Sequence, residues 1–191
     1  MNEKTKFVAR TGVLIALAAV FQIVFSLIPL SPILKTALLG AMVNLVLYVA
    51  VVSVGPISAV AISFITPLVA FLTGKLPLAM LIPFVGLGNA VMVLSYWLVR
   101  RNGREALDYF GLGLSAVLKF GIMQFMVSVI VPHLPGIKPP MIKSLSLTWS
   151  YPQFIAAAAG AVLSVFVVKA LSNTGILVSR MTAPKNQTVE K

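Results

Sequence analysis

The sequence contains no cysteine, a single histidine and only four acidic residues among its 191 residues. Without cysteine, disulfides and thiolate metal sites are impossible. A catalytic site usually needs paired carboxylates, a histidine beside a nucleophile, or a bound metal, and these side chains are too few to assemble one within a membrane span. We therefore expect a protein that is not an enzyme and that holds no metal ion and no cofactor.

A phosphate-binding motif is also missing. The chain has no GxxxxGK[ST] segment, whose backbone and lysine would hold the phosphates of ATP. The sequence therefore predicts that the chain does not hydrolyse ATP, and any active transport in which it takes part needs an ATP-driven partner.

Charged residues make up 10% of the chain and hydrophobic residues 59%, whereas about a quarter of the residues in an average soluble domain are charged. A spanning helix takes roughly 20 mostly apolar residues, so this length accommodates about six of them. We predict an all-α integral membrane protein, a compact bundle of six transmembrane helices. Residues 1–175 form this single domain, and residues 176–191 form a polar cytoplasmic tail.

Turn residues and charges separate six apolar stretches. We expect helices at about Phe7–Ile28, Lys35–Val52, Pro56–Leu72, Pro77–Val99, Gly111–Val131 and Tyr151–Leu171. The connection Pro132–Ser150 is proline-rich and much the longest. A connection of this length is either an ordered lid over a site or a plain exposed linker, and the sequence leaves both open.

The cations predict the orientation, because lysine and arginine beside helix ends are retained on the cytoplasmic side. With six helices both termini share a side, and most cations fall there: Lys4, Lys6, Arg10, Arg100, Arg101, Arg104, Lys169, Arg180, Lys185 and Lys191. We therefore place both termini in the cytoplasm. Topology and contact with anionic lipid account for the net charge of +11, so we expect no nucleic-acid partner.

Polar and aromatic side chains near the membrane are the candidate contacts for a small molecule, because irregular or polar groups at membrane depth are buried in protein or line a cavity. Pro67 and Pro83 interrupt predicted helices, and Pro83 leads through two glycines to Asn89. Interhelical hydrogen bonds are the alternative for the amides, and an aromatic belt is the alternative for the aromatics. The candidates are Asn44, Tyr48, Lys75, Asn89, Gln124, Trp149, Tyr151 and Gln153.

Lys119 is the one charged residue that lies well inside a predicted span rather than near its end. As the ninth residue of its expected helix, it either snorkels toward the interface or makes a structural hydrogen bond. A role in a cavity or at a partner surface is the other interpretation.

Small residues recur on one face of the first helix, at Ala9, Gly12, Ala16 and Ala19. Their spacing keeps them within about 80° of one another, and a smooth face lets another helix approach closely in lipid. That helix belongs either to the same bundle or to another protein. For a similar stripe in the last helix we favour packing inside the bundle; its members are Gln153, Ala157, Gly160 and Ser164.

Together these features resemble the substrate-binding S component of an energy-coupling factor (ECF) vitamin transporter. The resemblance rests on chain length, the six spans and three segments: Thr11–Val20, Val54–Pro56 and Tyr151–Ala161. It implies a subunit of the bacterial plasma membrane that binds a vitamin at its outer end and reorients on a transmembrane coupling subunit, driven by two ATPase subunits. It also implies that the loop around Gly74 and Lys75 is a gate.

The resemblance further implies that Ala9, Gly12, Ala16 and Ala19 dock on the coupling subunit. The chain departs from the family's strict alanine at every fourth residue. A membrane scaffold or assembly factor, using the same stripe without binding any small molecule, is the alternative function.

The expected outer end carries Lys35, Lys75, Lys138, Lys143 and His133 but no acidic side chain. Because burying an unpaired cation is costly, this end favours an anionic or neutral ligand. Pantothenate, a folate or another carboxylate or phosphate compound fits better than thiamine, and a neutral pyridoxine-like or deazapurine ring stays open.

Overall fold

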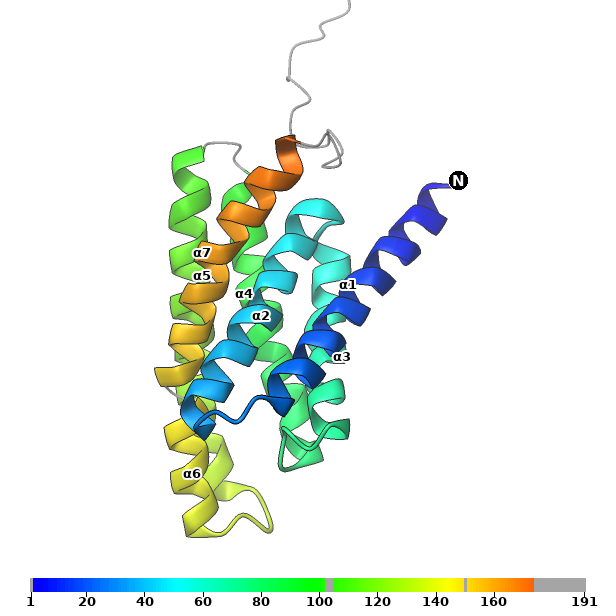
Figure 1. Cartoon of the computed structure of the whole chain (residues 1–191). Helices are drawn as coiled ribbons and strands as arrows, with labels where there is room; N and C mark the ends of the chain where they lie inside the picture. The colour runs from blue at the N-terminus through cyan, green and yellow to red at the C-terminus, as the bar shows by residue number, and fades with distance from the viewer. Residues whose placement is uncertain (1, 102–104, 150, 174–191) are drawn as a thin grey trace, which may run out of the picture.

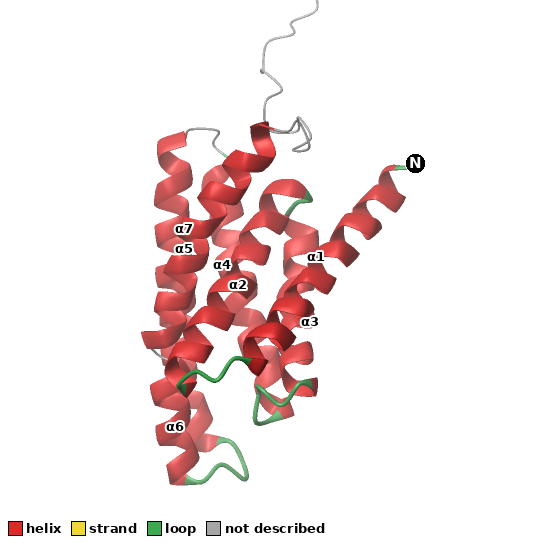
Figure 2. Ribbon diagram, in the orientation of Figure 1, coloured by secondary structure: helices red, strands yellow, loops and turns green. Residues whose placement is uncertain are grey.

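The computed structural model describes residues 2–101, 105–149 and 151–173. Helices make up almost all of this part of the chain, which contains no strand (Figures 1 and 2). The α-helices are α1 Glu3–Leu27, α2 Pro32–Ser53, α3 Pro56–Leu72, α4 Ile82–Arg100, α5 Glu105–Phe125, α6 Pro139–Trp149 and α7 Tyr151–Asn173. The predicted all-helical membrane bundle is confirmed, while the expected tail at residues 176–191 lies outside the described residues.

Within the part of the chain that the structure describes, five helical segments are long and apolar enough to cross a membrane: Glu3–Leu27, Pro32–Ser53, Ala79–Arg100, Leu107–His133 and Pro139–Ser172. The remaining predicted span is Pro56–Leu72, the helix α3, which is also apolar but has only 17 residues. At 1.5 Å per residue, α3 is about 26 Å long, somewhat less than the roughly 30 Å of a bilayer core.

A proline lies in the first turn of two helices, and a serine caps one of them. α3 starts at the predicted Pro56, whereas α2 starts at Pro32, three residues before the predicted Lys35. Pro32 occupies the first turn of α2, and the side chain of Ser31 accepts a hydrogen bond from the backbone of Leu34 at 3.4 Å. Pro56 opens α3 directly after Gly55, whose φ of 122° is accessible to glycine. A proline in the first turn removes an N–H that has no helical partner.

The predicted start of the fourth helix at Pro77 is wrong. α4 begins at Ile82, after a 3-10 turn at Ala79–Leu81, and Pro83 lies in its first turn. Pro83 therefore marks the beginning of a helix rather than an interruption within one.

The fifth helix starts earlier than predicted and ends irregularly. α5 begins at Glu105 rather than Gly111, and the chain continues as a π-helical turn at Met126–Ile130 and a 3-10 turn at Val131–His133. An interpretation of Pro132–Ser150 as a plain linker is also wrong, because α6 occupies Pro139–Trp149. Pro139 and Pro140 form the start of this helix rather than part of a loop.

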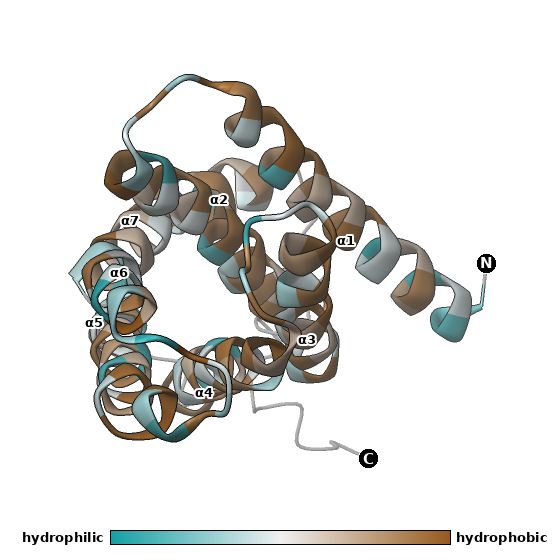
Figure 3. Cartoon of the chain, turned by 90° about the horizontal axis from the view of Figure 1, so that it is seen from below, coloured by the Kyte–Doolittle hydropathy of each residue, from teal (hydrophilic) through white to brown (hydrophobic). Residues whose placement is uncertain are grey.

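The helices form a ring when the bundle is viewed along its axis (Figure 3). α2, α3, α4, α5 and α7 surround the axis, and α1 lies outside the ring against α2 and α3. Figure 1 shows α1 leaning away from the other helices toward its N-terminus. We call the end that carries α6 and the α1–α2 and α3–α4 connections the α6 end; the start of α1 lies at the opposite end.

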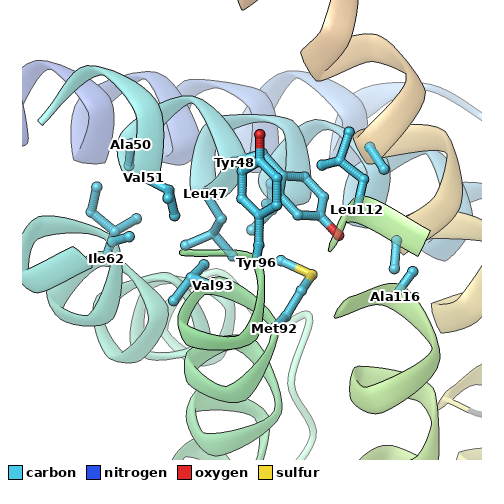
Figure 4. Packing of buried hydrophobic residues seen from close by; sticks show 14 residues of the cluster. Leu47, Tyr48, Ala50, Val51, Ile62, Met92, Val93, Tyr96, Leu112 and Ala116 are labelled. Carbon is cyan, nitrogen blue, oxygen red and sulfur yellow. The ribbon is translucent and has the colours of Figure 1, made fainter. Parts of the chain in front are cut away.

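Two clusters of buried side chains fill the bundle at different levels. The first surrounds Tyr48 and Tyr96, whose rings meet edge to face at 5.3 Å (Figure 4). The second lies at the α6 end, where Leu145 and Trp149 of α6 pack against Met123 and Met126. Residues of both clusters line the cavity described next.

Candidate functional site

A cavity of about 160 Å³ opens into the bundle at the α6 end. Every α-helix contributes to its wall, and the connection between α3 and α4 contributes two residues. The lining consists of Gln22, Lys35, Thr36, Leu39, Gly40, Val43, Asn44, Thr66, Pro67, Ala70, Lys75, Leu76, Val85, Asn89, Lys119, Trp149 and Gln153.

Lys119 and Asn44 form the most deeply buried polar pair in this wall. The Lys119 Nζ donates to Asn44 Oδ1 at 2.6 Å, and the two residues are 3% and 0% exposed. Because α5 begins at Glu105, Lys119 lies about 21 Å along the helix. The structure therefore excludes snorkelling, and both remaining interpretations hold: Lys119 makes a hydrogen bond and lines a cavity.

Gln22 joins α1 to α3 from the other side of the cavity. Its Nε2 donates to the backbone carbonyl of Thr66 at 3.0 Å, and Gln22 is 1% exposed. Thr66 directly precedes Pro67 inside α3. This contact holds the C-terminal half of α1 against the ring.

Four buried polar side-chain atoms have no hydrogen-bond partner among the described residues: Gln22 Oε1, Asn44 Nδ2, Thr66 Oγ1 and Asn89 Oδ1. All four belong to residues that line the cavity. A buried polar group without a partner costs about 1–3 kcal/mol. Residues with unpartnered polar atoms therefore gather around one cavity, as in a site for a polar ligand.

The cavity wall is positively charged. Lys35, Lys75 and Lys119 line it, and none of the lining residues is acidic. Lys35 Nζ donates to the carbonyl of Ser26 at 3.0 Å, which holds it at the α1–α2 connection. Lys75 is exposed, in the α3–α4 connection. Two lysines therefore lie near the α6 end, and Lys119 lies deeper.

Glycines bring the helices of the wall into close contact. A Cβ at Gly160 of α7 would lie 2.6 Å from the Asn44 Cβ, and a Cβ at Gly40 of α2 would lie 2.8 Å from the Ala156 Cβ. No side chain fits at either crossing without displacement, so the α2–α7 contact fixes the position of Asn44. The predicted internal packing of the last helix is confirmed.

The two glycines before Asn89 have the same packing role. A Cβ at Gly86 would lie 2.5 Å from the Phe64 ring, and one at Gly88 would lie 3.2 Å from the Met123 sulfur. They let α4 approach α3 and α5 closely, which places Asn89 in the wall.

Five of the eight predicted contact residues come together in the cavity: Asn44, Lys75, Asn89, Trp149 and Gln153. The other three do not. Tyr48 is fully buried, and its hydroxyl bonds to Ser115 Oγ at 2.9 Å. Gln124 is exposed and donates to Ser128 Oγ at 3.1 Å. Tyr151 is 74% exposed, with its ring beside Phe120.

Gln22, Thr66 and Lys35 line the cavity but are absent from the predicted contacts. Gln22 carries a usable signal, because it is the one amide side chain within the first predicted span. Thr66 lies beside Pro67, the proline inside α3. Pro67 indicates that this part of the helix is irregular, but it does not single out Thr66 as a contact residue.

The predicted docking stripe does not pack against the other helices among the described residues. Ala9, Gly12 and Ala16 are exposed and Ala19 is partly exposed, and a Cβ at Gly12 would meet no atom within 4 Å. α1 instead turns Thr11, Ala18 and Gln22 toward the bundle.

A family model described as "ECF transporter, substrate-specific component" matches residues 6–172. This region includes every residue that lines the cavity and the exposed stripe of α1. No curated protein and no solved structure matches the chain.

Proposed function

Because the chain belongs to the family of ECF transporter substrate-specific components, we propose that it binds a small water-soluble micronutrient in the cavity at the α6 end. A substrate-specific component is a membrane subunit of a transporter. The specific proposal is that this subunit captures a vitamin or related compound outside the cell and delivers it inward by reorienting.

The observation that carries this proposal is the set of unpartnered polar atoms in the cavity wall. Gln22, Asn44, Thr66 and Asn89 each bury an atom that needs a hydrogen-bond partner. A protein that only holds its helices together gains nothing from leaving these atoms unpaired. A polar ligand would pair them, which favours a binding subunit over a scaffold without a ligand.

Cavity size narrows the candidates. The volume of about 160 Å³ is close to the 150 Å³ of an apolar cavity that accepts benzene. This favours a compound with one ring or a short branched chain. Among the anionic candidates, pantothenate therefore fits better than a folate.

The exposed stripe of α1 supports docking on a transmembrane coupling subunit. Ala9, Gly12 and Ala16 present a smooth surface that no other described residue covers, and helices associate in lipid through such surfaces. Two ATPase subunits bound to the coupling subunit supply the energy, and the chain itself catalyses no reaction.

Orientation follows from the same proposal. Both termini lie in the cytoplasm of a bacterial cell, and the α6 end faces outward. Lys4, Lys6 and Arg10 then lie on the side where cations are retained, and the cavity opens toward the external ligand.

A thermal-shift screen of the purified full-length protein in detergent tests the proposed function. The panel consists of pantothenate, nicotinate, biotin, pyridoxine, riboflavin, thiamine and folate. We expect one compound to raise the melting temperature saturably, because a ligand that binds the folded state alone stabilises it by RT ln(1 + [L]/Kd). No shift with any compound would contradict the proposal and favour the scaffold.

A further inference from the structure

Hydrogen-bond donors gather on one side of the cavity. A lysine ammonium has donors only, so Asn44 must present Oδ1 to Lys119 Nζ, as the 2.6 Å contact shows. The Nδ2 of the same amide consequently faces elsewhere and has no partner. Lys119 and Asn44 thus offer N–H groups side by side from α5 and α2.

Hydrogen-bond acceptors come from other helices. A backbone carbonyl only accepts, so the contact with Thr66 fixes Nε2 of Gln22 toward it and leaves Oε1 without a partner. Asn89 Oδ1 likewise has no donor. These two oxygens, from α1 and α4, require a hydroxyl or N–H group from whatever fills the cavity.

The charge of the wall is not neutralised within the described part of the chain. Lys119 is 3% exposed, and its recorded hydrogen bond goes to a neutral amide. Carboxylate ion pairs form elsewhere: Lys6 with Glu3 at the start of α1, and Arg100 at the end of α4 with Asp108 of α5. A buried ammonium without a counter-charge is unfavourable, and an anionic ligand would supply that charge.

Resting on the proposed function, we propose that the ligand is a small organic anion, a carboxylate that also carries a hydroxyl or N–H donor. Its carboxylate accepts hydrogen bonds from Lys119 Nζ and Asn44 Nδ2. Its donor group reaches Gln22 Oε1 or Asn89 Oδ1. Asn44 Nδ2 and one of the two orphaned amide oxygens then have complementary partners, and the ligand binds in one direction.

Lys35 and Lys75 favour an anion also near the α6 end, where the cavity opens. Lys35 precedes Asn44 by nine residues on α2, a separation of about 14 Å along the helix. An anion that approaches from the α6 end therefore meets two lysines before it reaches Lys119. A cation would be repelled along the same path.

Matched acid and neutral compounds test the charge of the ligand. The probes are pantothenate with pantothenol, nicotinate with nicotinamide, and biotin with biotinamide, titrated into the purified full-length protein by calorimetry. We expect one acid to bind at least about tenfold more tightly than its neutral counterpart. Equal binding within a pair, or binding of a neutral or cationic vitamin alone, would overturn this inference but keep the proposed function. No binding of any of these compounds would overturn both this inference and the proposed function.

Substitution of Lys119 tests the residue that carries the inference. Lys119→Met should weaken binding of the acid by about tenfold or more while changing the affinity of the neutral counterpart by less than about threefold. Lys119→Gln, which keeps a hydrogen-bond donor without the charge, is the second variant in case the first fails to fold. Lys143→Met is the matched control, because Lys143 is exposed on α6 and does not line the cavity. An unchanged ratio between acid and neutral compound in the Lys119 variants would contradict the proposal.

Discussion

Individual amide side chains distinguish the cavity from the rest of the bundle interior. Elsewhere, buried hydroxyls are satisfied locally: Ser63 donates to the carbonyl of Ala59 at 2.8 Å and Ser164 to that of Ala161 at 2.7 Å. Gln22, Asn44 and Asn89 of the cavity wall instead each leave one buried polar atom without a partner among the described residues.

Gln22 gives the sharpest test among single side chains. Gln22→Leu removes both the bond to Thr66 and the acceptor oxygen in the cavity, so we expect ligand affinity to fall by about tenfold, the equivalent of one lost hydrogen bond. Titration calorimetry with the compound that the thermal-shift panel identifies would measure this change.

Gln124→Leu is the matched control, since it removes the same amide from an exposed position outside the cavity. The ligand affinity of this variant should stay within about twofold of that of the unsubstituted protein. A larger loss in the Gln124 variant than in the Gln22 variant would contradict the placement of the site.

Residue type predicts some of the residues that line the cavity. For the others, the rotation of the helix about its axis decides whether the side chain faces the cavity. Asn44 and Asn89 are predictable, because an amide in an apolar helix needs a partner. Tyr48 lies only one turn beyond Asn44, yet it packs in the core, and Gln124 faces outward. The sequence around these residues is apolar on every side, so it contains no polar face from which their direction could be predicted.

A proline directly after a turn predicts the start of α3, whereas the prolines at the start of α6 do not by themselves predict a helix. Pro56 begins α3 as predicted. Pro139 and Pro140 lie in the proline-rich connection that the sequence leaves open as a lid or a linker, and they form the first turn of α6. The signal for this helix is the spacing of Leu145 and Trp149 on one face, which packs on the second cluster.

Helix α1 carries the proposed docking surface, and a change there should separate transport from binding. Gly12→Leu adds a large side chain to the smooth face without touching the bundle, since a Cβ at Gly12 meets no atom within 4 Å. We expect uptake of the labelled ligand by cells that contain the coupling subunits to fall to background. The dissociation constant of the purified variant should remain within about twofold.

Gly121→Leu is the matched control for this experiment. Gly121 is exposed on α5, and a Cβ there also meets no atom within 4 Å. Its uptake should be retained. Normal uptake by the Gly12 variant would contradict docking through α1.

The molecule as a whole has two different ends. One end gathers the start of α1 with Lys4, Lys6 and Arg10, and the other holds the cavity with Lys35 and Lys75. Composition predicted the bundle and this division of charge. The position of α1 outside the ring was not predictable, because an apolar helix has no polar face to distinguish lipid from protein.

The location of the bound compound tests the proposed site most directly. An experimental structure of the full-length protein with the compound that gives the largest thermal shift would show it. We predict a single ligand in the cavity, with its carboxylate within hydrogen-bond distance of Lys119 Nζ and Asn44 Nδ2 and a donor group near Gln22 or Asn89. A ligand bound elsewhere on the chain, or one with its carboxylate turned away from Lys119, would contradict the site as described.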